Sequence, residues 1–402
     1  MARSLRGLRL RFGASATNHA ALRLLGSRLP RLTGGWMPWL SLDRYDPPPL
    51  RGPDWVRLRP ILSGVCGTDT GLLTGHASAV LSPFASFPAV LGHEVVGVVE
   101  ATGQRVVLDP VISCTVRGLE PCRRCAAGQA RFCLRAADGD LSPGMLIGYC
   151  ADLPGGWSDG MVAHASQLHP VPEQLSDEVA VLLEPFSVAL HAVLARPPEA
   201  GERVLVIGGG TLGLCTVAAL RLVAPRAEVV LLARHGTQRD MGERLGAGSA
   251  AGGRDAAVQA AIRHAGARAH RSILGQVVLS GGFTQVYDAV GSQRSLADAM
   301  RVAEPGGRMV LVGGPGQVSG LDWTLAWTRE LRIEGTYVYG SEPSLPGSPH
   351  TFDEAIRLLV ANPQMPLGEL VTHRFRLEEW RRAMAVSLTR GKSGALKVVF
   401  TP

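Results

Sequence analysis

The sequence has little lysine, few aromatic residues and no long apolar run free of glycine or charge. Only Lys392 and Lys397 are lysines among 41 basic residues, and aromatic residues make up 5% of the chain. No basic stripe with interleaved aromatics is present, which argues against a nucleic-acid-binding surface. The longest apolar run, residues 204–223, contains four glycines and Arg221. It therefore indicates a buried strand, turn and helix rather than a membrane span.

Acidic residues are absent from the first 42 positions, which hold seven arginines. The rest of the chain carries 34 basic and 34 acidic groups, so the formal net charge of +7 lies in this stretch. The body of the protein therefore has no bias toward an anionic partner. Residues 1–42 have the composition of a mitochondrial transit peptide, but we favour a basic extension or a first strand in an arginine-rich protein.

Seven cysteines, an odd number, argue against a complete disulfide framework. A reducing, cytoplasmic location is the expectation that follows. Four of the cysteines fall within twenty residues, which in such a compartment favours metal binding over disulfides.

The chain has 402 residues, of which 46% are hydrophobic and 19% charged, as expected for an ordinary folded protein of two domains.

The pattern of apolar residues changes near residue 200. Before it, short β-branched runs are broken by glycine and proline, which predicts an antiparallel, barrel-like domain. After it, predicted strands alternate with helices, which indicates a parallel, doubly wound sheet. The fold class is therefore α/β, with a barrel-like catalytic domain in residues 1–195 and 340–402 and a dinucleotide-binding domain in residues 196–339. The predicted strands of the second domain are residues 203–207, 228–233, 285–289 and 308–312, and its first helices are residues 212–223 and 239–245.

Residues 204–213 read V-L-V-I-G-G-G-T-L-G, an apolar strand that enters a glycine loop and then a helix. In this context the glycines predict a dinucleotide site, because they permit a tight turn, a close approach to pyrophosphate and close helix–strand packing. The helix N-terminus favours the phosphate charge. The residues assigned to this site are Gly208, Gly210, Thr211, Leu212 and Gly213.

The next strand ends in L-L-A-R-H, where NAD-dependent proteins place an acid that binds the ribose hydroxyls. Ala233 has no carboxylate to repel a 2′-phosphate, and Arg234 and Arg239 offer planar donor groups to it. These arginines could also be ordinary surface charges. We predict that NADP(H) is preferred, with NAD(H) as the other option.

Three segments carry residues that are typical of metal ligands. They read V-C-G-T-D at 65–69, G-H-E at 92–94 and E-P-F-S-V-A-L-H at 184–191. Alone, Cys66 is best interpreted as a buried small residue. Together, a thiolate, an imidazole and carboxylates are the ligands of a catalytic Zn²⁺ with an open position. The sequence therefore predicts a catalytic zinc site formed by Cys66, His93, Glu94 and Glu184.

From about residue 54 to 400, these motifs and their order resemble the zinc-dependent medium-chain dehydrogenase/reductase family of alcohol, sorbitol and threonine dehydrogenases. The resemblance implies a GroES-like β-barrel domain and a Rossmann domain. In the Rossmann domain it implies that Val312, at the end of a strand, lies on the nicotinamide side of the cofactor. It also implies that the Thr68 hydroxyl takes the proton of the substrate alcohol. Many relatives carry a histidine slightly further along to pass the proton to solvent, but residues 69–71 contain none. Asp69 is expected to orient the loop.

The same resemblance implies a structural zinc bound by cysteines, because Cys122, Cys125 and Cys133 match three of the family's ligands. The fourth ligand is expected at position 119, which is leucine. Cys114 lies five residues earlier and could complete a closed four-cysteine site, since ligands need only converge in space. The alternative is a lobe without metal.

These features predict a zinc-dependent, NADP(H)-preferring alcohol dehydrogenase or carbonyl reductase. Its partner is expected to be a small alcohol, polyol, amino alcohol or carbonyl compound, with no nucleic-acid or membrane partner. Because members of this family form dimers and tetramers, the resemblance implies a homodimer or homotetramer. The alternatives are a zinc-free quinone or enoyl reductase of the same fold, and a non-catalytic dinucleotide-binding redox sensor.

Overall fold

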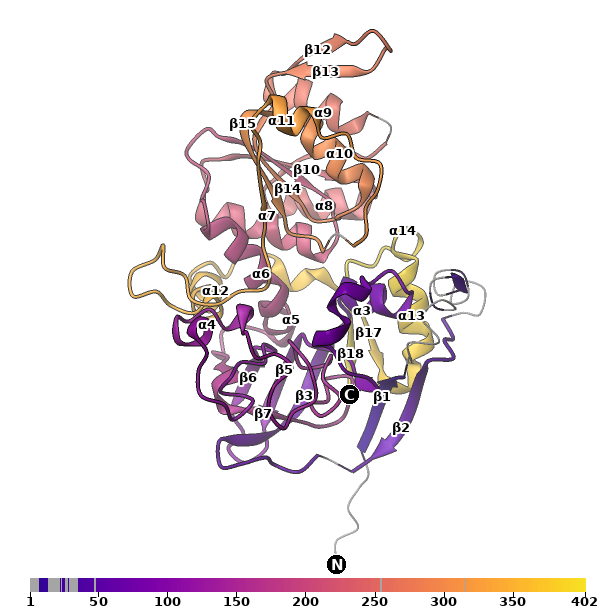
Figure 1. Cartoon of the computed structure of the whole chain (residues 1–402), viewed down its shortest axis with the longest axis vertical. Coiled ribbons are helices and arrows are strands. Elements are labelled where there is room, and N and C mark those ends of the chain that lie inside the picture. Colours follow the sequence, from indigo (N-terminus) through magenta and orange to yellow (C-terminus); the bar gives the residue numbers. More distant parts are fainter. Residues whose placement is uncertain are drawn as a thin grey trace, which may run out of the picture. The chain divides into compact units, whose positions relative to one another are not determined.

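The computed structural model describes residues 7–13, 22, 24, 25, 28, 35–46, 48–253, 255–314 and 316–402. Within them the chain divides into two compact units (Figure 1). Unit 1 comprises residues 1–184, 352–361 and 371–402, and unit 2 comprises residues 185–351 and 362–370. Two helices, α6 (Leu183–Leu194) and α12 (Thr351–Ala361), begin at these borders. None of the described helices is long and apolar enough to cross a membrane.

Unit 1 is built on a largely antiparallel sheet whose strand order is β17-β18-β3-β5-β6-β8, with β7 paired to β3. The C-terminal strand β18 joins it by pairing with β3, so segments far apart in the sequence lie side by side in one sheet. Proline cannot donate to a ladder, and Pro60 stands where the β3–β5 register shifts. The strands are β3 (Trp55–Gly64), β5 (Val95–Val99), β6 (Arg105–Leu108), β7 (Met161–His164), β8 (Leu168–Pro170), β17 (Val371–Arg376) and β18 (Lys397–Thr401).

A second, three-stranded sheet in unit 1 has the order β2-β1-β4. Its strands are β1 (Gly7–Phe12), β2 (Leu40–Tyr45) and β4 (Ala89–Val90). The basic N-terminal stretch thus contributes two antiparallel strands, and the remainder of residues 1–42 lies largely outside the described residues. Apolar side chains from both sheets fill the core, including Leu10 and Phe12 from β1 and Phe400 from β18. In its described part, unit 1 contains the helices α3 (Gly67–Leu73), α4 (Arg123–Ala126), α5 (Asp177–Val181), α13 (Trp380–Leu388) and α14 (Arg390–Ser393), together with nearly all of α12.

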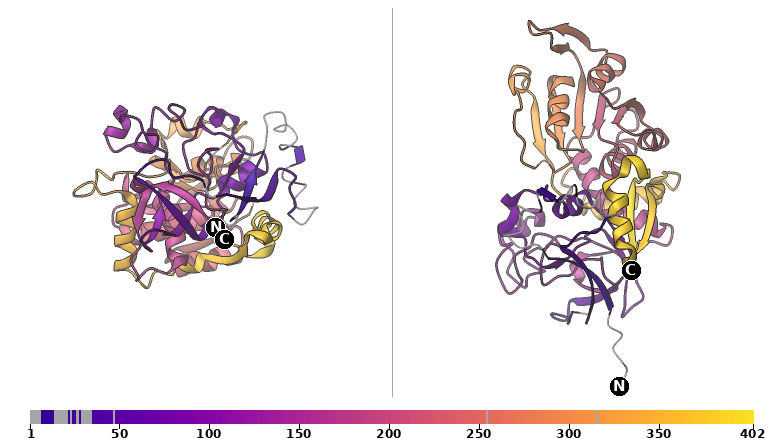
Figure 2. Two further views of the ribbon diagram at one scale, coloured as in Figure 1. Left: turned by 90° about the horizontal axis from the view of Figure 1, so that it is seen from below. Right: turned by 90° about the vertical axis from the view of Figure 1, so that its right-hand side faces the viewer.

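Unit 2 is a six-stranded parallel sheet of order β11-β10-β9-β14-β15-β16. Helices cover both of its faces (Figures 1 and 2), as the doubly wound fold requires. The strands are β9 (Arg203–Ile207), β10 (Glu228–Ala233), β11 (Gly248–Ala251), β14 (Phe283–Asp288), β15 (Ala303–Leu311) and β16 (Arg332–Gly335), and the helices are α7 (Thr211–Val223), α8 (Gly236–Arg244), α9 (Ala256–Ala265), α10 (Gln293–Val302) and α11 (Thr324–Thr328).

The antiparallel hairpin of β12 (Arg268–Arg271) and β13 (Val277–Ser280) is a part of unit 2 that the sequence pattern did not predict. It extends away from the parallel sheet (Figure 1). The side chains of Ile273 and Leu274 at its turn are exposed. The predicted α/β class, with a barrel-like domain and a doubly wound domain, is confirmed.

Candidate active site and structural cysteine lobe

Cys66 stands where the chain leaves β3 and begins α3, and it is the N-cap residue of that helix. Its backbone N–H donates to Asp69 Oδ2 at 2.9 Å, which closes the first turn. The turn requires glycine at position 64, because a Cβ there would lie 1.8 Å from Glu94 Oε2. The motif around Cys66 thus positions its sulfur beside the G-H-E segment.

His93 and Glu94 lie directly before β5. The position before them, residue 92, requires glycine for steric reasons. Gly92 has a φ of +94°, and a Cβ there would lie 2.3 Å from Trp157 Cδ1. Only glycine adopts this conformation at such close range without strain. The turn directs both polar side chains into unit 1, where His93 and Glu94 are 4% and 1% exposed.

The structure brings Cys66, His93 and Glu94 together. One sulfur, one ring nitrogen and one carboxylate oxygen all lie within 4.8 Å of one another. The buried Nδ1 of His93 has no hydrogen-bond partner of good geometry, and Asp69 Oδ1 lies 3.5 Å from it. Sulfur, nitrogen and oxygen donors at this spacing, backed by a carboxylate behind the histidine, fit a Zn²⁺ ion.

The electrostatics of this cluster also fit a cation. Burial lowers the pKa of His93, but the charges of Asp69 and Cys66 outweigh it and raise that pKa well above the usual value. Burial raises the pKa of Asp69, yet His93, Tyr149 and the Cys66 amide bring it below its usual value. The anionic surroundings therefore attract positive charge to the imidazole, and a metal ion can take the place of a proton there.

Glu94 has a second partner that the motif did not indicate. The ammonium group of Lys397, on β18, forms an ion pair with Glu94 Oε2, and both side chains are 1% exposed. Without this lysine, the buried carboxylate would lose its ion-pair partner, which is costly. Lys397 therefore sets the charge balance behind the three donors.

Glu184 is buried in the first turn of α6, but its carboxylate is not part of the group formed by Cys66, His93 and Glu94. Its role as a ligand stays a prediction.

Thr68 is exposed on the first turn of α3. Its Oγ1 lies 3.1 Å from the hydroxyl of Tyr149, which also lies 2.7 Å from Asp69 Oδ1.

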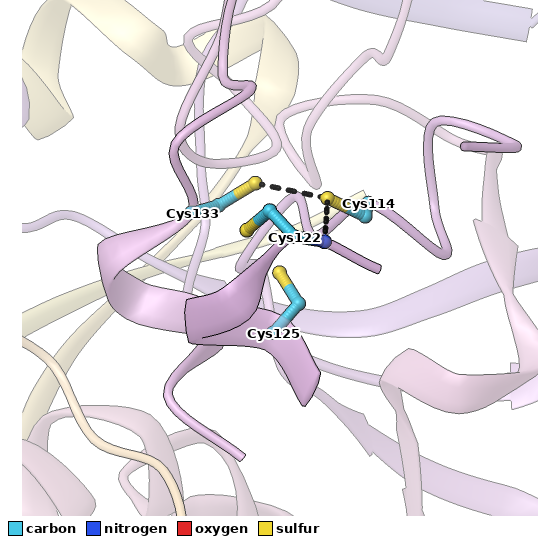
Figure 3. Close-up of side chains that lie close together, drawn as sticks. All are labelled: Cys114, Cys122, Cys125 and Cys133. Atoms are coloured by element: carbon cyan, nitrogen blue, oxygen red, sulfur yellow. Dashed lines mark hydrogen bonds between the residues drawn. The ribbon is translucent and has the colours of Figure 1, made fainter. Parts of the chain in front are cut away.

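The cysteine lobe forms a second cluster in unit 1 (Figure 3). The sulfurs of Cys114, Cys122, Cys125 and Cys133 all lie within 4.8 Å of one another, and those of Cys114 and Cys133 are 3.6 Å apart. Cys122 caps α4, which also carries Cys125. Leu119, at the position where the family spacing places a ligand, packs toward Gly139 instead. Four converging sulfurs fit a closed zinc site.

Backbone hydrogen bonds and burial give the thiols of the lobe different pKa values. The N–H groups of Leu134 and Cys125 lower the pKa of Cys122 to about 6, whereas burial raises the pKa of Cys125 and Cys133. Arg117 lies beside the lobe and is 5% exposed. Its guanidinium donates to the carbonyl oxygens of residues 136, 138, 141, 142 and 144, and so fixes the return loop of the chain.

In unit 2, the glycine loop joins β9 to α7. Gly208 has a φ of +105°, and a Cβ there would lie 2.5 Å from Val290 Cγ2. A Cβ on Gly213 would lie 1.8 Å from the carbonyl oxygen of Gly208, so this glycine permits close helix–strand packing. Gly210 caps α7, and Thr211 and Leu212 form its first turn. The first amides of this helix are the groups that would hold a pyrophosphate.

The end of β10 carries the residues assigned to the cofactor's ribose. Ala233 is buried, and Arg234 is exposed. One nitrogen of Arg239 lies 3.4 Å and 3.3 Å from the carbonyl oxygens of Ala233 and Arg234. Among the described residues, no carboxylate forms an ion pair with either arginine. This corner is therefore basic, as the sequence predicted.

Two further loops follow neighbouring strands at the point where the strand order reverses. Asp288 ends β14, and its Oδ1 accepts from the N–H groups of Val290 and Gly291. Val312 follows β15, and its N–H donates to the carbonyl of Asp288 at 3.0 Å. These contacts bring the two loops beside Gly208, at the place where open α/β sheets bind ligands.

Sequence reasoning missed Lys397, Tyr149 and Arg117. Lys397 had a weak signal, because it is one of two lysines and interrupts an otherwise apolar segment, A-L-K-V-V-F. Tyr149 and Arg117 lie in irregular loops, where no periodicity reveals the direction of a side chain. Their partners are carbonyl oxygens or residues about 80 positions away, and these are visible only in the fold.

Comparison with known proteins places the chain in a family. The alcohol dehydrogenase GroES-like domain matches residues 52–173, and the zinc-binding dehydrogenase domain matches residues 211–361. The chain is 31% identical over 283 residues to the starvation-sensing protein RspB of Escherichia coli (strain K12), a match that covers 68% of this chain and 72% of that protein. It therefore belongs to the zinc-dependent medium-chain dehydrogenase/reductase family, and the predicted resemblance is confirmed.

Two more similarities cover nearly the whole chain. An L-threonine 3-dehydrogenase of Anaeromyxobacter dehalogenans (strain 2CP-C) is 26% identical over 365 residues, 89% of this chain and 93% of that protein. The crystal structure of a zinc-binding dehydrogenase from Sinorhizobium meliloti 1021, bound to NADP, matches with a TM-score of 0.71 and 25% identity, over 99% of each chain. The chain is thus an oxidoreductase of this family that acts on small molecules.

Proposed function

We propose that this protein is a zinc-dependent alcohol dehydrogenase or carbonyl reductase that prefers NADP(H) and acts on an alcohol, polyol or amino alcohol. The observation that carries the proposal is the convergence of the half-buried Cys66 with the buried His93 and Glu94 in an anionic cluster. A zinc ion supplies Lewis acidity that makes an alcohol hydroxyl acidic near neutral pH, and NADP⁺ accepts the hydride.

The chain's own residues have separate tasks in this proposal. Cys66 and His93 hold the ion, with Glu94 beside them and Glu184 as a further carboxylate of the site. Asp69 orients the His93 ring through Nδ1, and Lys397 compensates the charge of Glu94. Thr68 Oγ1 accepts the hydrogen bond of the alcohol hydroxyl and takes up its proton while it releases its own, so this hydroxyl relays the proton and does not keep it.

In unit 2, the amides of α7 hold the pyrophosphate, and Arg234 and Arg239 bind the 2′-phosphate. The relative from Sinorhizobium meliloti 1021, whose crystal structure holds NADP, supports this choice. Cys114, Cys122, Cys125 and Cys133 hold a structural zinc. The seven free cysteines are in keeping with a reducing cytoplasm. The assembly we expect is a homodimer or homotetramer, which light scattering measures directly.

The test is metal analysis of the purified protein together with a cofactor-coupled screen of alcohols, polyols, amino alcohols and aldehydes. Two zinc ions per chain and turnover with NADP(H) are expected. Turnover without zinc would instead indicate a zinc-free reductase. If cofactor binds but no compound is turned over, the protein is a redox sensor and not the enzyme proposed.

A further inference from the structure

The hydroxyl of Tyr149 lies between two residues of the catalytic loop. It is 2.7 Å from Asp69 Oδ1 and 3.1 Å from Thr68 Oγ1. The Tyr149 ring packs against the imidazole of His93, with 5.6 Å between the ring centres and 42° between the planes. The phenol thus contacts the loop that bears the proposed proton acceptor and the ring of a proposed ligand.

Counting protons fixes the direction of these two hydrogen bonds. A phenol has one proton to donate, whereas an ionised carboxylate can only accept. Asp69 already accepts from the N–H of Cys66 through Oδ2, and its Oδ1 faces the phenol. Tyr149 therefore donates to Asp69, and the proton of the 3.1 Å bond must come from the hydroxyl of Thr68.

With these two directions, the Thr68 hydroxyl donates its proton to the Tyr149 oxygen, and its lone pairs stay available to accept another hydrogen bond. A threonine hydroxyl is otherwise free to rotate and can either donate or accept. We propose that Tyr149 is a positioning residue that holds the Thr68 hydroxyl as a hydrogen-bond acceptor toward the substrate alcohol. The inference rests on the proposed function. It assigns a role to a residue 81 positions from Thr68, in a chain whose loop at residues 69–71 has no histidine.

The first experiment detects the hydrogen bond without any turnover. Fluorotyrosine is introduced at position 149 of the full chain, and its ¹⁹F resonance is recorded in the zinc-loaded protein. Thr68→Val, which removes the donor, should shift the resonance, and Thr68→Ser should restore it. Thr70→Val is the matched control, because the Thr70 hydroxyl bonds to the carbonyl of Gly67 at 2.9 Å and not to the phenol. An unchanged resonance in Thr68→Val would overturn the inference.

The second experiment measures the effect on hydride transfer. Tyr149→Phe keeps the ring on His93 and removes only the hydroxyl. We expect a roughly ten-fold slower single-turnover rate, an increased solvent isotope effect and a KM within about two-fold, because the Thr68 hydroxyl loses the acceptor of its proton and Asp69 loses one donor. Tyr45→Phe is the control, because the Tyr45 hydroxyl bonds to the backbone of Gly160 in the same unit. Zinc content and unfolding temperature verify that each variant is folded.

A double-mutant cycle separates positioning from a structural role. If Tyr149 acts through Thr68, then Tyr149→Phe should change the residual rate of Thr68→Ala less than about two-fold. Equal effects in both backgrounds would overturn the inference. A wild-type protein that turns over no alcohol would refute the proposed function instead, and the ¹⁹F result would still decide whether Tyr149 orders the Thr68 hydroxyl.

Discussion

The two units assemble their sites in different ways. In unit 1, the cluster of Cys66, His93, Glu94 and Lys397 is drawn from segments that are far apart in sequence. In unit 2, the glycine loop and the basic corner at Arg234 come from one strand–helix–strand stretch of about thirty residues. The cofactor site is therefore determined locally, whereas the metal cluster depends on the whole barrel-like sheet.

The difference also concerns charge. The cluster in unit 1 places buried carboxylates beside a half-buried thiol, and the buried ammonium of Lys397 forms an ion pair with Glu94. The site in unit 2 uses backbone amides and exposed arginines, which need no such compensation. Changes to the metal cluster of unit 1 should consequently affect metal content, stability and catalysis together, while changes to the cofactor site of unit 2 should affect cofactor binding alone.

The strongest test of this separation is His93→Ala. Removing a ligand should lower kcat by roughly 10³-fold or more, because the acidity of the alcohol depends on the metal. NADPH binding, measured by fluorescence titration, should change less than about two-fold, since the glycine loop belongs to unit 2. Cys66→Ser is the companion variant. A His93→Ala protein that kept appreciable activity would contradict the metal mechanism.

The cysteine lobe provides the next test. Cys114→Ser should reduce zinc from two ions to one per chain and lower the free energy of unfolding by more than about 3 kcal/mol, because structural zinc contributes directly to folding. Adding Leu119→Cys should not restore the metal, since Leu119 packs toward Gly139 and away from the sulfurs. A stable Cys114→Ser protein with unchanged zinc would show that the lobe holds no metal.

Lys397→Met tests the charge balance behind the cluster. Loss of the ammonium leaves Glu94 buried without its counter-ion, which should cost about 3–5 kcal/mol of unfolding free energy in urea. Combining it with Glu94→Gln should recover part of that loss. The penalty should be smaller in zinc-loaded protein if the carboxylate faces the ion. Equal penalties with and without zinc would place Glu94 outside the metal's reach.

Much of unit 2 could be predicted because its signals are local. The expected strands at 203–207 and 228–233 match β9 and β10, and the glycine spacing marks the turn between β9 and α7. The β12–β13 hairpin was missed because β12 is exposed along its whole length and β13 is a run of only four residues. In unit 1, the motifs indicated Cys66, His93 and Glu94, and the structure brings them together.

What could not be predicted depends on how distant segments meet. The gap of seven residues after Cys114 left its role open, and only the fold shows that its turn reaches the other three sulfurs. Glu184 is buried, as His93 and Glu94 are, but its carboxylate does not belong to the group that these two residues form with Cys66. Its position depends on how α6 begins, and no residue pattern encodes that. The domain borders at 195 and 340 and the roles of the individual site residues stay predictions.

The smallest expected effect lies in unit 2 and concerns cofactor choice. Arg234→Ala should raise the KM for NADPH roughly ten- to a hundredfold, because a charge-assisted contact with phosphate contributes about 1.5–3 kcal/mol. The KM for NADH, which lacks the 2′-phosphate, should hardly change. Adding Ala233→Asp places a carboxylate where that phosphate would lie and offers the ribose hydroxyls an acceptor, so the double variant should prefer NADH.

Side-by-side kinetics with both cofactors measure this preference, and zinc content serves as the control. Because Arg234 is exposed and belongs to unit 2, neither variant should alter zinc content or the unfolding temperature. A change in bound zinc would refute the independence of the two sites. A wild-type protein that already prefers NADH would refute the interpretation of Ala233 and Arg234 but not the family assignment, since the glycine loop serves both cofactors.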